Sequence, residues 1–363
     1  INKHKFQEIF AKGLDIYIVG SNDFYSQREQ LSKRNLPLTS SSLNSLEPFC
    51  KVHCNLKEVH KTGLGSSAAL ITSLVAALFV HFEIVSNKTD DRGLIHNVAQ
   101  FCHCLAQGKV GSGFDVSAAV WGSHIYKRFS PSILDDVMNQ KVNLSALNNI
   151  VDPASNVWDN QTTKFSLPPE FTLVLADIDA GSHTPSMVGR VLKWHKENAD
   201  QAISNYLKEL NKNYQKNKEL YNMAIKICEN VKASEWTLLG VQNPNNTIIA
   251  LFSSIFITFQ KIRGLLREMS ELSQVPIEPP KQTKLLDACN EIPGLIMAGV
   301  PGAGGYDAIF CIGMGNAFNT RIEKLWNSWE EMSVGPLLSK ESSKGYMIEQ
   351  ISEVSGLSKY LNS

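Results

Sequence analysis

Three glycine-rich stretches hold the residue types in this chain that could handle phosphate. The first, Lys61-Thr-Gly-Leu-Gly-Ser-Ser-Ala68, places two glycines beside two hydroxyls. Glycine adopts backbone angles that other residues avoid, so main-chain N–H groups there can line an anion site. Residues 68–80 are mostly apolar and predict a buried helix whose N-terminus follows the turn. Unpaired N–H groups and the dipole favour phosphate at such an end. A plain tight turn capped by serine is the alternative.

The other two stretches also join predicted regular elements. Gly108-Lys-Val-Gly-Ser-Gly-Phe-Asp115 follows a predicted helix over 93–107 and carries one cation and one carboxylate. Pro301-Gly-Ala-Gly-Gly-Tyr-Asp-Ala308 follows a predicted strand over 295–300. On the helix before the second turn, polar side chains recur at helical spacing: His96, Gln100, His103 and Gln107. One glycine-rich turn is weak support for a site, whereas three that meet in one pocket would be strong support.

Two familiar phosphate patterns do not fit. A P-loop requires Gly-Lys-Ser/Thr, but Gly108-Lys109 is followed by valine. A dinucleotide fingerprint matches Gly63-Leu-Gly-Ser-Ser-Ala68, with Glu83 near the expected distance. The predicted strand before it, over 49–59, carries charged residues, whereas a central parallel strand is buried on both faces. A dehydrogenase is therefore a minor alternative, which tight NADH binding without ATP binding would favour.

Composition limits the classes of partner. The chain has 363 residues, with 35 basic and 35 acidic side chains. This balance makes nucleic acid and membrane surfaces poor candidates. The apolar run over 68–80, taken as the longest, is too short to span a bilayer. Seven scattered cysteines favour reduced thiols and a cytoplasmic location. The clusters around Cys50 and Cys102 have poor zinc spacing, so a metal site there is the less favoured interpretation.

Hydrophobic patterns predict the order of elements along the chain. Helices are expected over 1–12, 93–107, 185–233 and 248–273, with a short one after Pro279-Pro280. Strands are expected over 14–19, 49–59, 123–129, 171–177, 295–300 and 309–312. Residues 20–48 are predicted to form a long loop and 130–165 an irregular connection. The tail after Trp326 gives no clear pattern.

Together, the three motifs resemble those of the fungal-type phosphomevalonate kinases of the GHMP kinase superfamily. The resemblance covers about residues 1–312. It implies a two-domain α/β (α+β) fold, with a first domain like ribosomal protein S5 domain 2 over 1–165 and a ferredoxin-like domain over 166–363. The implied reaction transfers the γ-phosphoryl group of ATP to 5-phosphomevalonate, with Mg²⁺. The oligomeric state is left open.

The resemblance and the residue types assign roles within the motifs. Lys109 and Asp115 are the expected catalytic residues, with Lys109 screening the acceptor phosphate from Asp115. The acceptor's second pKa is about 6, so its phosphate needs no strong general base. The nucleotide is expected to contact Lys61, Gly63, Leu64, Gly65, Ser66, Ser67 and Ala68, with the Ser66 hydroxyl also toward Mg²⁺. The acceptor is expected near Ser112, Gly113, Ser182, Gly302, Ala303, Gly304 and Gly305.

The chain departs from the family pattern in two places. Family members begin with a strand and a Pro-Gly-Lys first motif, which nothing here matches. We therefore expect these 363 residues, made alone, to be unstable or associated and to show at most trace activity. No acid lies between Gly93 and Gly113, where mevalonate kinases carry a magnesium ligand, so a helix carboxylate ligand is in doubt. Another GHMP-type kinase, acting on mevalonate or homoserine, and a non-catalytic sensor on the same fold are the alternatives.

Overall fold

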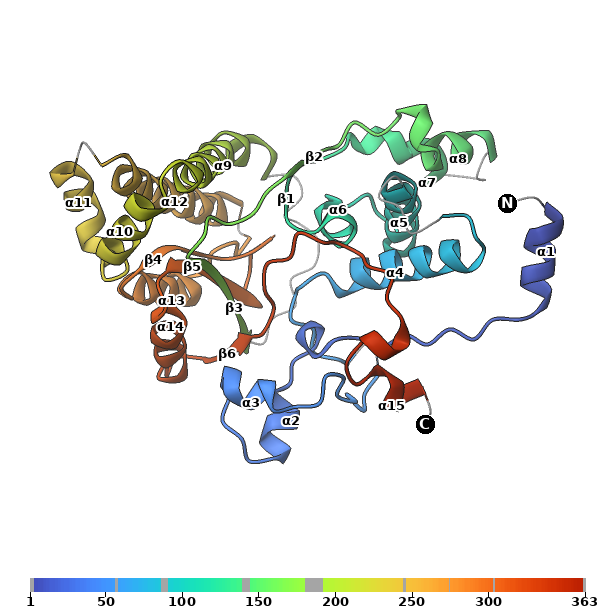
Figure 1. Ribbon diagram of the computed structural model, residues 1–363, viewed down its shortest axis with the longest axis horizontal. Helices are drawn as coiled ribbons and strands as arrows, with labels where there is room; N and C mark the ends of the chain where they lie inside the picture. Colours follow the sequence, from blue (N-terminus) through green and yellow to red (C-terminus); the bar gives the residue numbers. More distant parts are fainter. Residues whose placement is uncertain are drawn as a thin grey trace.

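The computed structural model describes residues 3–55, 58–85, 91–138, 144–179, 192–243, 246–273, 275–302 and 304–361. Two of the predicted site residues, Ser182 and Ala303, lie outside these ranges. The remaining candidates can be placed on the elements below, whose arrangement is shown in Figure 1.

Three packed helices carry the first two glycine-rich turns at their ends. They are α4 (Ser66–His81), α5 (Arg92–Gln107) and α6 (Phe114–Trp121). Ala68, Ala99 and Val116 are fully buried in the cluster between them. Small side chains at these positions let the helices approach closely, so their ends are held in fixed relation. The helices predicted over 68–80 and 93–107 are confirmed.

The segment that follows α6, up to about residue 165, contains more regular structure than the sequence indicated. Strand β1 (His124–Lys127) pairs antiparallel with β2 (Gln161–Lys164). Between these strands lie the short helices α7 (Asp135–Met138) and α8 (Leu144–Val151). The expectation that 130–165 is irregular is therefore wrong in part, because short helices in polar sequence leave little periodicity to detect.

The N-terminal region differs most from expectation. It contains α1 (Lys3–Ala11), α2 (Arg28–Lys33) and α3 (Ser40–Asn44), two of them inside the predicted loop. The strands predicted over 14–19 and 49–59 are wrong: the described residues there lie in no strand, and an isolated bridge joins Tyr25 to Lys61. Ile16 and Ile18 are 50% and 62% exposed. An alternating pattern indicates a strand only where a neighbouring strand supplies the hydrogen bonds.

The second part is built on a four-stranded antiparallel sheet in the order β4-β5-β3-β6 (Figure 1). Its strands are β3 (Phe171–Asp179), β4 (Leu295–Gly299), β5 (Ala308–Met314) and β6 (Ser333–Leu337). The predicted strands over 171–177, 295–300 and 309–312 are confirmed. Strand β6 comes from the tail that showed no pattern, because it is short and contains Gly335 and Pro336. Proline is tolerated there because β6 is an edge strand.

Helices cover both faces of this sheet. On β5, Phe310 and Ile312 pack into one cluster while Ile309 and Cys311 pack into another, as side-chain alternation requires. The second face is covered by α13 (Pro280–Asn290) and α14 (Phe318–Asn327). On the first face, α12 (Thr247–Ser273) packs against the sheet, and three further helices pack against α12 in the same cluster: α9 (Leu192–Lys216), α10 (Lys218–Cys228) and α11 (Trp236–Gln242).

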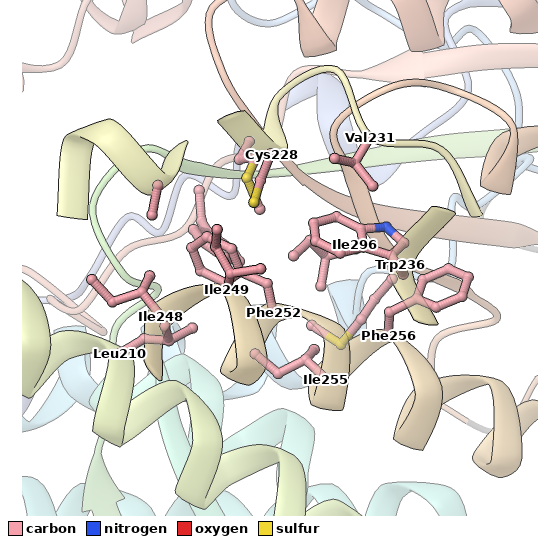
Figure 2. Packing of buried hydrophobic residues seen from close by; sticks show 14 of the residues in the cluster. Leu210, Cys228, Val231, Trp236, Ile248, Ile249, Phe252, Ile255, Phe256 and Ile296 are labelled. Atoms are coloured by element: carbon pink, nitrogen blue, oxygen red, sulfur yellow. The ribbon is translucent and has the colours of Figure 1, made fainter. Parts of the chain in front are cut away.

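Helix α12 is the central element of the first face. Its Phe252 and Phe256 lie against the fully buried Trp236 (Figure 2), whose Nε1 donates to the Leu295 carbonyl at 3.1 Å. By length and composition, α12 is the one helix among the described residues that could cross a membrane, with a mean hydropathy of 1.4. Half of that stretch is buried inside the protein, as in a core helix. The prediction that 68–80 is the longest apolar stretch is therefore wrong.

After β6 the chain returns to the packed helices α4, α5 and α6 (Figure 1). The Ser123 N–H donates to the Ser342 carbonyl at 2.7 Å, and a side chain at Gly122 would overlap this segment. Helix α15 (Leu357–Leu361) follows, and Lys359 pairs with Glu47 at 2.8 Å. The tail, predicted to belong to the second domain, thus contacts residues of the predicted first domain. The domain boundary near residue 165 stays a prediction.

Candidate active site

The first glycine-rich turn leads directly into α4. Gly63 and Gly65 both have φ of +75°, and Gly65 is the N-cap of the helix without a capping side chain. The first N–H groups of α4 therefore have no partner within the helix or from a cap. Thr62 anchors the turn from below by donating its hydroxyl to the Asp23 carbonyl at 2.5 Å. The result is a fixed turn that offers backbone donors, as an anion site requires.

The other residues predicted to contact the nucleotide divide by burial. Lys61 and Ser67 are exposed, while Leu64 and Ser66 are half-buried. Ala68 is fully buried between the helices. Its side chain therefore anchors α4 in the core, and only its backbone N–H is suited to the predicted role.

The second turn runs from the end of α5 to the start of α6. Gly108 caps α5 with φ of +65°, and Gly113 caps α6 with φ of +79°. A Cβ at Gly113 would lie 2.7 Å from Gln100 Oε1 and from Phe129 Cε1, so the turn fits only glycine at this point. Lys109 is exposed, and no ion pair joins it to Asp115 in the described part of the chain.

Two side chains at the end of β1 hold this second turn. The Tyr126 hydroxyl donates to the Ser112 carbonyl at 3.1 Å, and Arg128 donates to the Gly111 carbonyl at 2.9 Å. Burial raises the pKa of Tyr126 to about 12, so the phenol stays protonated and keeps its donor role. Neither residue was predicted for the site, because each lies outside the glycine-rich stretch that it contacts.

Asp115 lies in the first turn of α6 and faces the first glycine-rich turn. Its Oδ1 accepts the Val116 N–H at 3.0 Å, and its Oδ2 is 3.9 Å from His103 Nε2. The same His103 nitrogen is 3.1 Å from Ser67 Oγ and 2.9 Å from Gln107 Nε2. His103 therefore connects the first turn to Asp115. Sequence analysis assigned it no role, although its spacing with Gln107 on one helix face was the available signal.

The third turn, after β4, lies beside the start of α6. Gly302 has φ of +60°, and a Cβ there would lie 3.7 Å from Phe114 Cζ. Gly304 has φ of +76°, and a Cβ there would overlap the Ile277 carbonyl oxygen. The Gly305 N–H donates to that same oxygen at 2.8 Å. The backbone of this turn is therefore pressed against residue 277 and has no room for side chains.

All three glycine-rich turns meet at the N-terminus of α6. A Cβ at Gly65 would lie 3.5 Å from the Cβ of Asp115, and Gly302 lies beside Phe114. Two helix N-termini, those of α4 and α6, thus contribute to one place, and each favours negative charge. This arrangement suits a ligand or pair of ligands with several phosphate groups.

The described residues give little support to a structural metal site. They contain no group of three or more His, Cys, Asp or Glu side chains able to hold a metal ion. All seven cysteines are unpaired thiols, and Cys104, Cys228, Cys289 and Cys311 are buried. The chain offers hydroxyl and carboxylate oxygens near the first two turns, the ligand types that Mg²⁺ prefers beside substrate phosphates.

A small cavity lies away from the glycine-rich turns, between the N-terminal region and β3. It has a volume of about 30 Å³ and is lined in part by Gln27, Arg28 and Asp177. Arg28 Nε pairs with the buried Asp177 at 3.1 Å. A space of this size holds about one water molecule, which excludes a nucleotide.

Comparison with known proteins identifies similar sequences over most of the chain. The family model for the GHMP kinases N terminal domain matches residues 38–123. A peroxisomal phosphomevalonate kinase of Arabidopsis thaliana is 40% identical over 96% of this chain and 74% of its own length. A phosphomevalonate kinase of Candida albicans is 34% identical over 91% of this chain and 75% of its own length. One from Aspergillus fumigatus is 39% identical, over 87% and 62%.

Solved structures show a weaker similarity. Streptococcus pneumoniae phosphomevalonate kinase in complex with phosphomevalonate and AMPPNP has a TM-score of 0.48 and 17% identity, covering 93% of this chain and 80% of that one. A Lin0012 protein from Listeria innocua has a TM-score of 0.47 and 20% identity, covering 81% and 70%.

Proposed function

This chain belongs to the phosphomevalonate kinase family, and we propose that it transfers the γ-phosphoryl group of ATP to (R)-5-phosphomevalonate. The products are 5-diphosphomevalonate and ADP, in the pathway that supplies isoprenoid and sterol precursors. Family membership rests on relatives that are 40% and 34% identical and of which the chain covers about three quarters. The chain accordingly has the GHMP kinase fold, with a mixed helix-and-sheet architecture.

The observation that carries this function is the meeting of three glycine-rich turns at the start of α6, beside Phe114 and Asp115. A phosphoryl transfer between two phosphate-bearing molecules needs donors for several anionic groups at one place. The turn at Gly65 lies within van der Waals distance of Asp115, and the turn at Gly302 lies within that distance of the neighbouring Phe114, so both turns approach the start of α6. A site for an uncharged acceptor would need fewer such donors.

The first turn and α4 provide the nucleotide side of the site. Backbone N–H groups over Gly63–Ala68 donate to the β- and γ-phosphates, and their dipole stabilises charge as it moves toward the β–γ bridging oxygen. Lys61 is exposed at the entry to the turn and contributes positive charge. The turn is held before ligand arrives, through Thr62 and the buried Ala68, so binding requires little reorganisation.

On the acceptor side, a phosphate oxygen attacks the γ-phosphorus while the bond to the β–γ bridging oxygen breaks and ADP leaves. The acceptor phosphate is largely dianionic at neutral pH, so no hydroxyl proton has to be removed. Asp115 then orients the acceptor group, and Lys109 offsets the repulsion between the two negative charges. The exposed Ser112 and Gly302 provide acceptor surface, while the buried Gly113 and Gly305, with Gly304, shape the turns behind it. The acceptor contacts proposed for Ser182 and Ala303 lie outside the described residues.

Mg²⁺ fits this site as an ion held mainly by the nucleotide. Ser66 is half-buried at the start of α4, and Asp115 faces the same turn with its side chain 25% exposed. A Mg²⁺ ion bound to ATP needs one or two protein oxygens, which these two residues would provide. When bound, the ion neutralises phosphate charge. A further carboxylate on α5 is absent, since residues 93–113 contain no acid.

An ATP-consumption assay of the complete protein tests the proposal, with mevalonate, 5-phosphomevalonate, diphosphomevalonate, homoserine and galactose as acceptors. Turnover with 5-phosphomevalonate alone would support it. Turnover with mevalonate or homoserine would favour another GHMP-type kinase. Binding of ATP without turnover of any acceptor would favour a non-catalytic sensor.

We place the reaction in the cytoplasm, with the small-molecule acceptor as partner and with no nucleic acid or membrane partner. The balanced charge and the burial of half of the apolar stretch in α12 support this. The relative from Arabidopsis thaliana is a peroxisomal phosphomevalonate kinase, so the peroxisome is the alternative location. Imaging of the tagged protein beside a peroxisomal marker distinguishes the two.

A further inference from the structure

We propose that Ser270 and the ion pair Arg263–Glu278 are positioning residues for the third glycine-rich turn. The inference rests on the proposed function, because it assumes that this turn contacts the substrates. None of the three residues belongs to a glycine-rich stretch. They act through the segment 275–279, which links α12 to α13 and lies directly under the turn.

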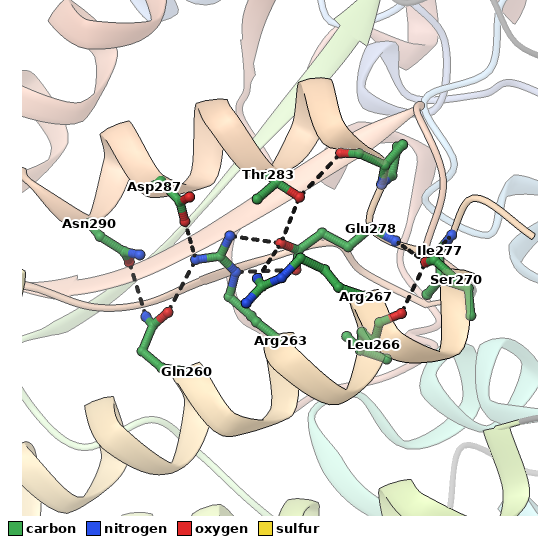
Figure 3. A network of polar contacts seen from close by, with 11 residues as sticks. Gln260, Arg263, Leu266, Arg267, Ser270, Ile277, Glu278, Thr283, Asp287 and Asn290 are labelled. Atoms are coloured by element: carbon green, nitrogen blue, oxygen red, sulfur yellow. Dashed lines mark hydrogen bonds and ion pairs between the residues drawn. The ribbon is translucent and has the colours of Figure 1, made fainter. Parts of the chain in front are cut away.

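Ser270 fixes the backbone of this segment. Its Oγ accepts two N–H groups, from Ile277 at 3.0 Å and from Glu278 at 3.1 Å, and donates to the Leu266 carbonyl at 3.0 Å (Figure 3). The Ile277 N–H also donates to the Val275 carbonyl at 2.8 Å, so Ser270 shares this donor and is the acceptor described for the Glu278 N–H. Ile277 is 2% exposed and packs in a cluster with Met269 and Val275, so the segment is also anchored by apolar contacts.

Glu278 fixes the same segment through its side chain, which is 0% exposed. Arg263 donates to both carboxylate oxygens, at 2.7 Å and 3.1 Å, and Arg267 donates at 3.0 Å (Figure 3). Although burial acts to lower the pKa of Arg263, its hydrogen bond and charge interaction with Glu278 raise it. Thr283 of α13 adds a fourth donor at 3.2 Å. A buried carboxylate with this many donors has one stable orientation, because any other leaves charge unpaired.

The segment transmits its position to the turn through the Ile277 carbonyl. The Gly305 N–H donates to that oxygen at 2.8 Å, and Gly304 lies so close that any side chain would overlap it. One residue further, the Gln282 amide donates to the Tyr306 carbonyl at 3.0 Å. A shift of residue 277 would therefore move Gly304 and Gly305, and with them Gly302 beside Phe114 at the start of α6.

The test compares Ser270→Ala with Ser254→Ala in the full chain. Both serines lie on α12, and both donate to the carbonyl four residues earlier, Ser254 to Ala250 at 2.8 Å. Among the contacts described, the Ser270 hydroxyl also accepts the N–H groups of Ile277 and Glu278, whereas the Ser254 hydroxyl accepts neither. We expect Ser270→Ala to raise the KM for 5-phosphomevalonate several-fold and to lower kcat/KM by about tenfold or more. Ser254→Ala should stay within about twofold.

Hydrogen exchange of peptides covering 301–308 gives a readout that does not depend on activity. Faster exchange there in Ser270→Ala, unchanged exchange in Ser254→Ala, and recovery in Ser270→Thr would support the proposal. A purely structural role would lower the amount of active enzyme without changing the KM, and that outcome would overturn it. So would unchanged exchange over 301–308 in a folded Ser270→Ala protein.

A second variant keeps the proposal testable if Ser270→Ala does not fold. Arg267→Gln removes one donor to Glu278 from a side chain that is 38% exposed and leaves Arg263 in place. Lys261→Gln, at an exposed position of the same helix, is its control. We expect faster exchange over 301–308 in Arg267→Gln alone, and equal exchange in both variants would overturn the proposal. Absence of kinase activity in the complete unmutated protein would count against the proposed function, while the exchange comparison would still decide the positioning role.

Discussion

Asp115 packs its Cβ against the bare backbone of Gly65, at 3.5 Å from the position that a side chain on Gly65 would take. The two residues come from different glycine-rich turns, separated by the whole of α5. Their contact places the predicted phosphate donors of α4 beside the carboxylate predicted to orient the acceptor. In the proposed reaction, the γ-phosphate of ATP and the phosphate of the acceptor would therefore lie at neighbouring positions without a large movement of the backbone.

Gly65→Val should greatly weaken ATP binding in a protein that still folds. A β-branched residue at φ of +75° costs roughly 1–2 kcal/mol, and its methyl groups would enter the space that faces Asp115. Gly13→Val is the matched control, because Gly13 has φ of +78° with nothing within 4 Å of an added Cβ. Calorimetric titration with ATP measures the difference. Normal ATP affinity in folded Gly65→Val would remove the first turn from the site.

Lys109→Ala in the complete enzyme should lower kcat/KM for 5-phosphomevalonate by about 10²-fold or more, a loss of roughly 3 kcal/mol. The reason is that Lys109, exposed in the second turn, would no longer offset the repulsion between Asp115 and the acceptor. Lys127→Ala removes an exposed lysine of β1 that lies outside all three turns, and it serves as control. Unchanged kinetics in Lys109→Ala would exclude the screening role.

Asp115→Asn should lower kcat by less than in an alcohol-phosphorylating relative. No hydroxyl proton has to be removed from a phosphate acceptor, so the loss reflects orientation and ion binding alone. The control is the pH dependence of kcat in both proteins: a general base at residue 115 predicts an acidic limb that disappears in the variant. An acidic limb that is present in the parent enzyme and absent from Asp115→Asn would show that Asp115 removes a proton. Protonation of the acceptor phosphate, with its second pKa of about 6, gives a limb that both proteins share.

Local sequence patterns predicted the turns and their helices because each needs little beyond its own residues. Glycines at 63, 65, 108 and 113 have positive φ in the structure, and α4, α5 and α12 follow runs of apolar side chains. The strands predicted over 14–19 and 49–59 did not form because pairing depends on a neighbouring strand. The role of His103 depends on the contact between α5 and the first turn, which residue spacing within one helix cannot reveal.

Gly304→Ala should be more harmful than Gly302→Ala in the same turn. Both positions have positive φ, so the backbone penalty is similar. The added methyl group would lie 3.7 Å from Phe114 at Gly302, but at Gly304 it would overlap the Ile277 carbonyl and lie 2.8 Å from its Cγ2. We expect Gly304→Ala to lose at least about 1 kcal/mol more in unfolding free energy and to lose more activity. Chemical denaturation and kcat/KM of the two variants measure this, and equal losses would argue against a turn held by residue 277.

Buried His96 should make the protein less stable as the pH falls from about 6.5 to about 4. Its ring packs against Trp121 and Trp158, and burial lowers its pKa to about 4. In the unfolded chain, a histidine binds a proton below about pH 6.5. The unfolded state therefore binds more protons in this window, so the contribution is complete above pH 6.5 and is lost as the pH falls, by up to about 3 kcal/mol.

Urea denaturation at a series of pH values, for the parent protein and for His96→Gln, isolates this contribution. The variant is expected to be less stable at pH 7 and to show a shallower loss of unfolding free energy between pH 6.5 and 4. His81→Gln replaces an exposed histidine at the end of α4 and should keep the parent's slope. Because carboxylates also titrate near the lower end of this window, the comparison rests on the difference between slopes. Equal slopes in the parent and in His96→Gln would mean that the ring between Trp121 and Trp158 accepts a proton in the folded protein as readily as in the unfolded chain.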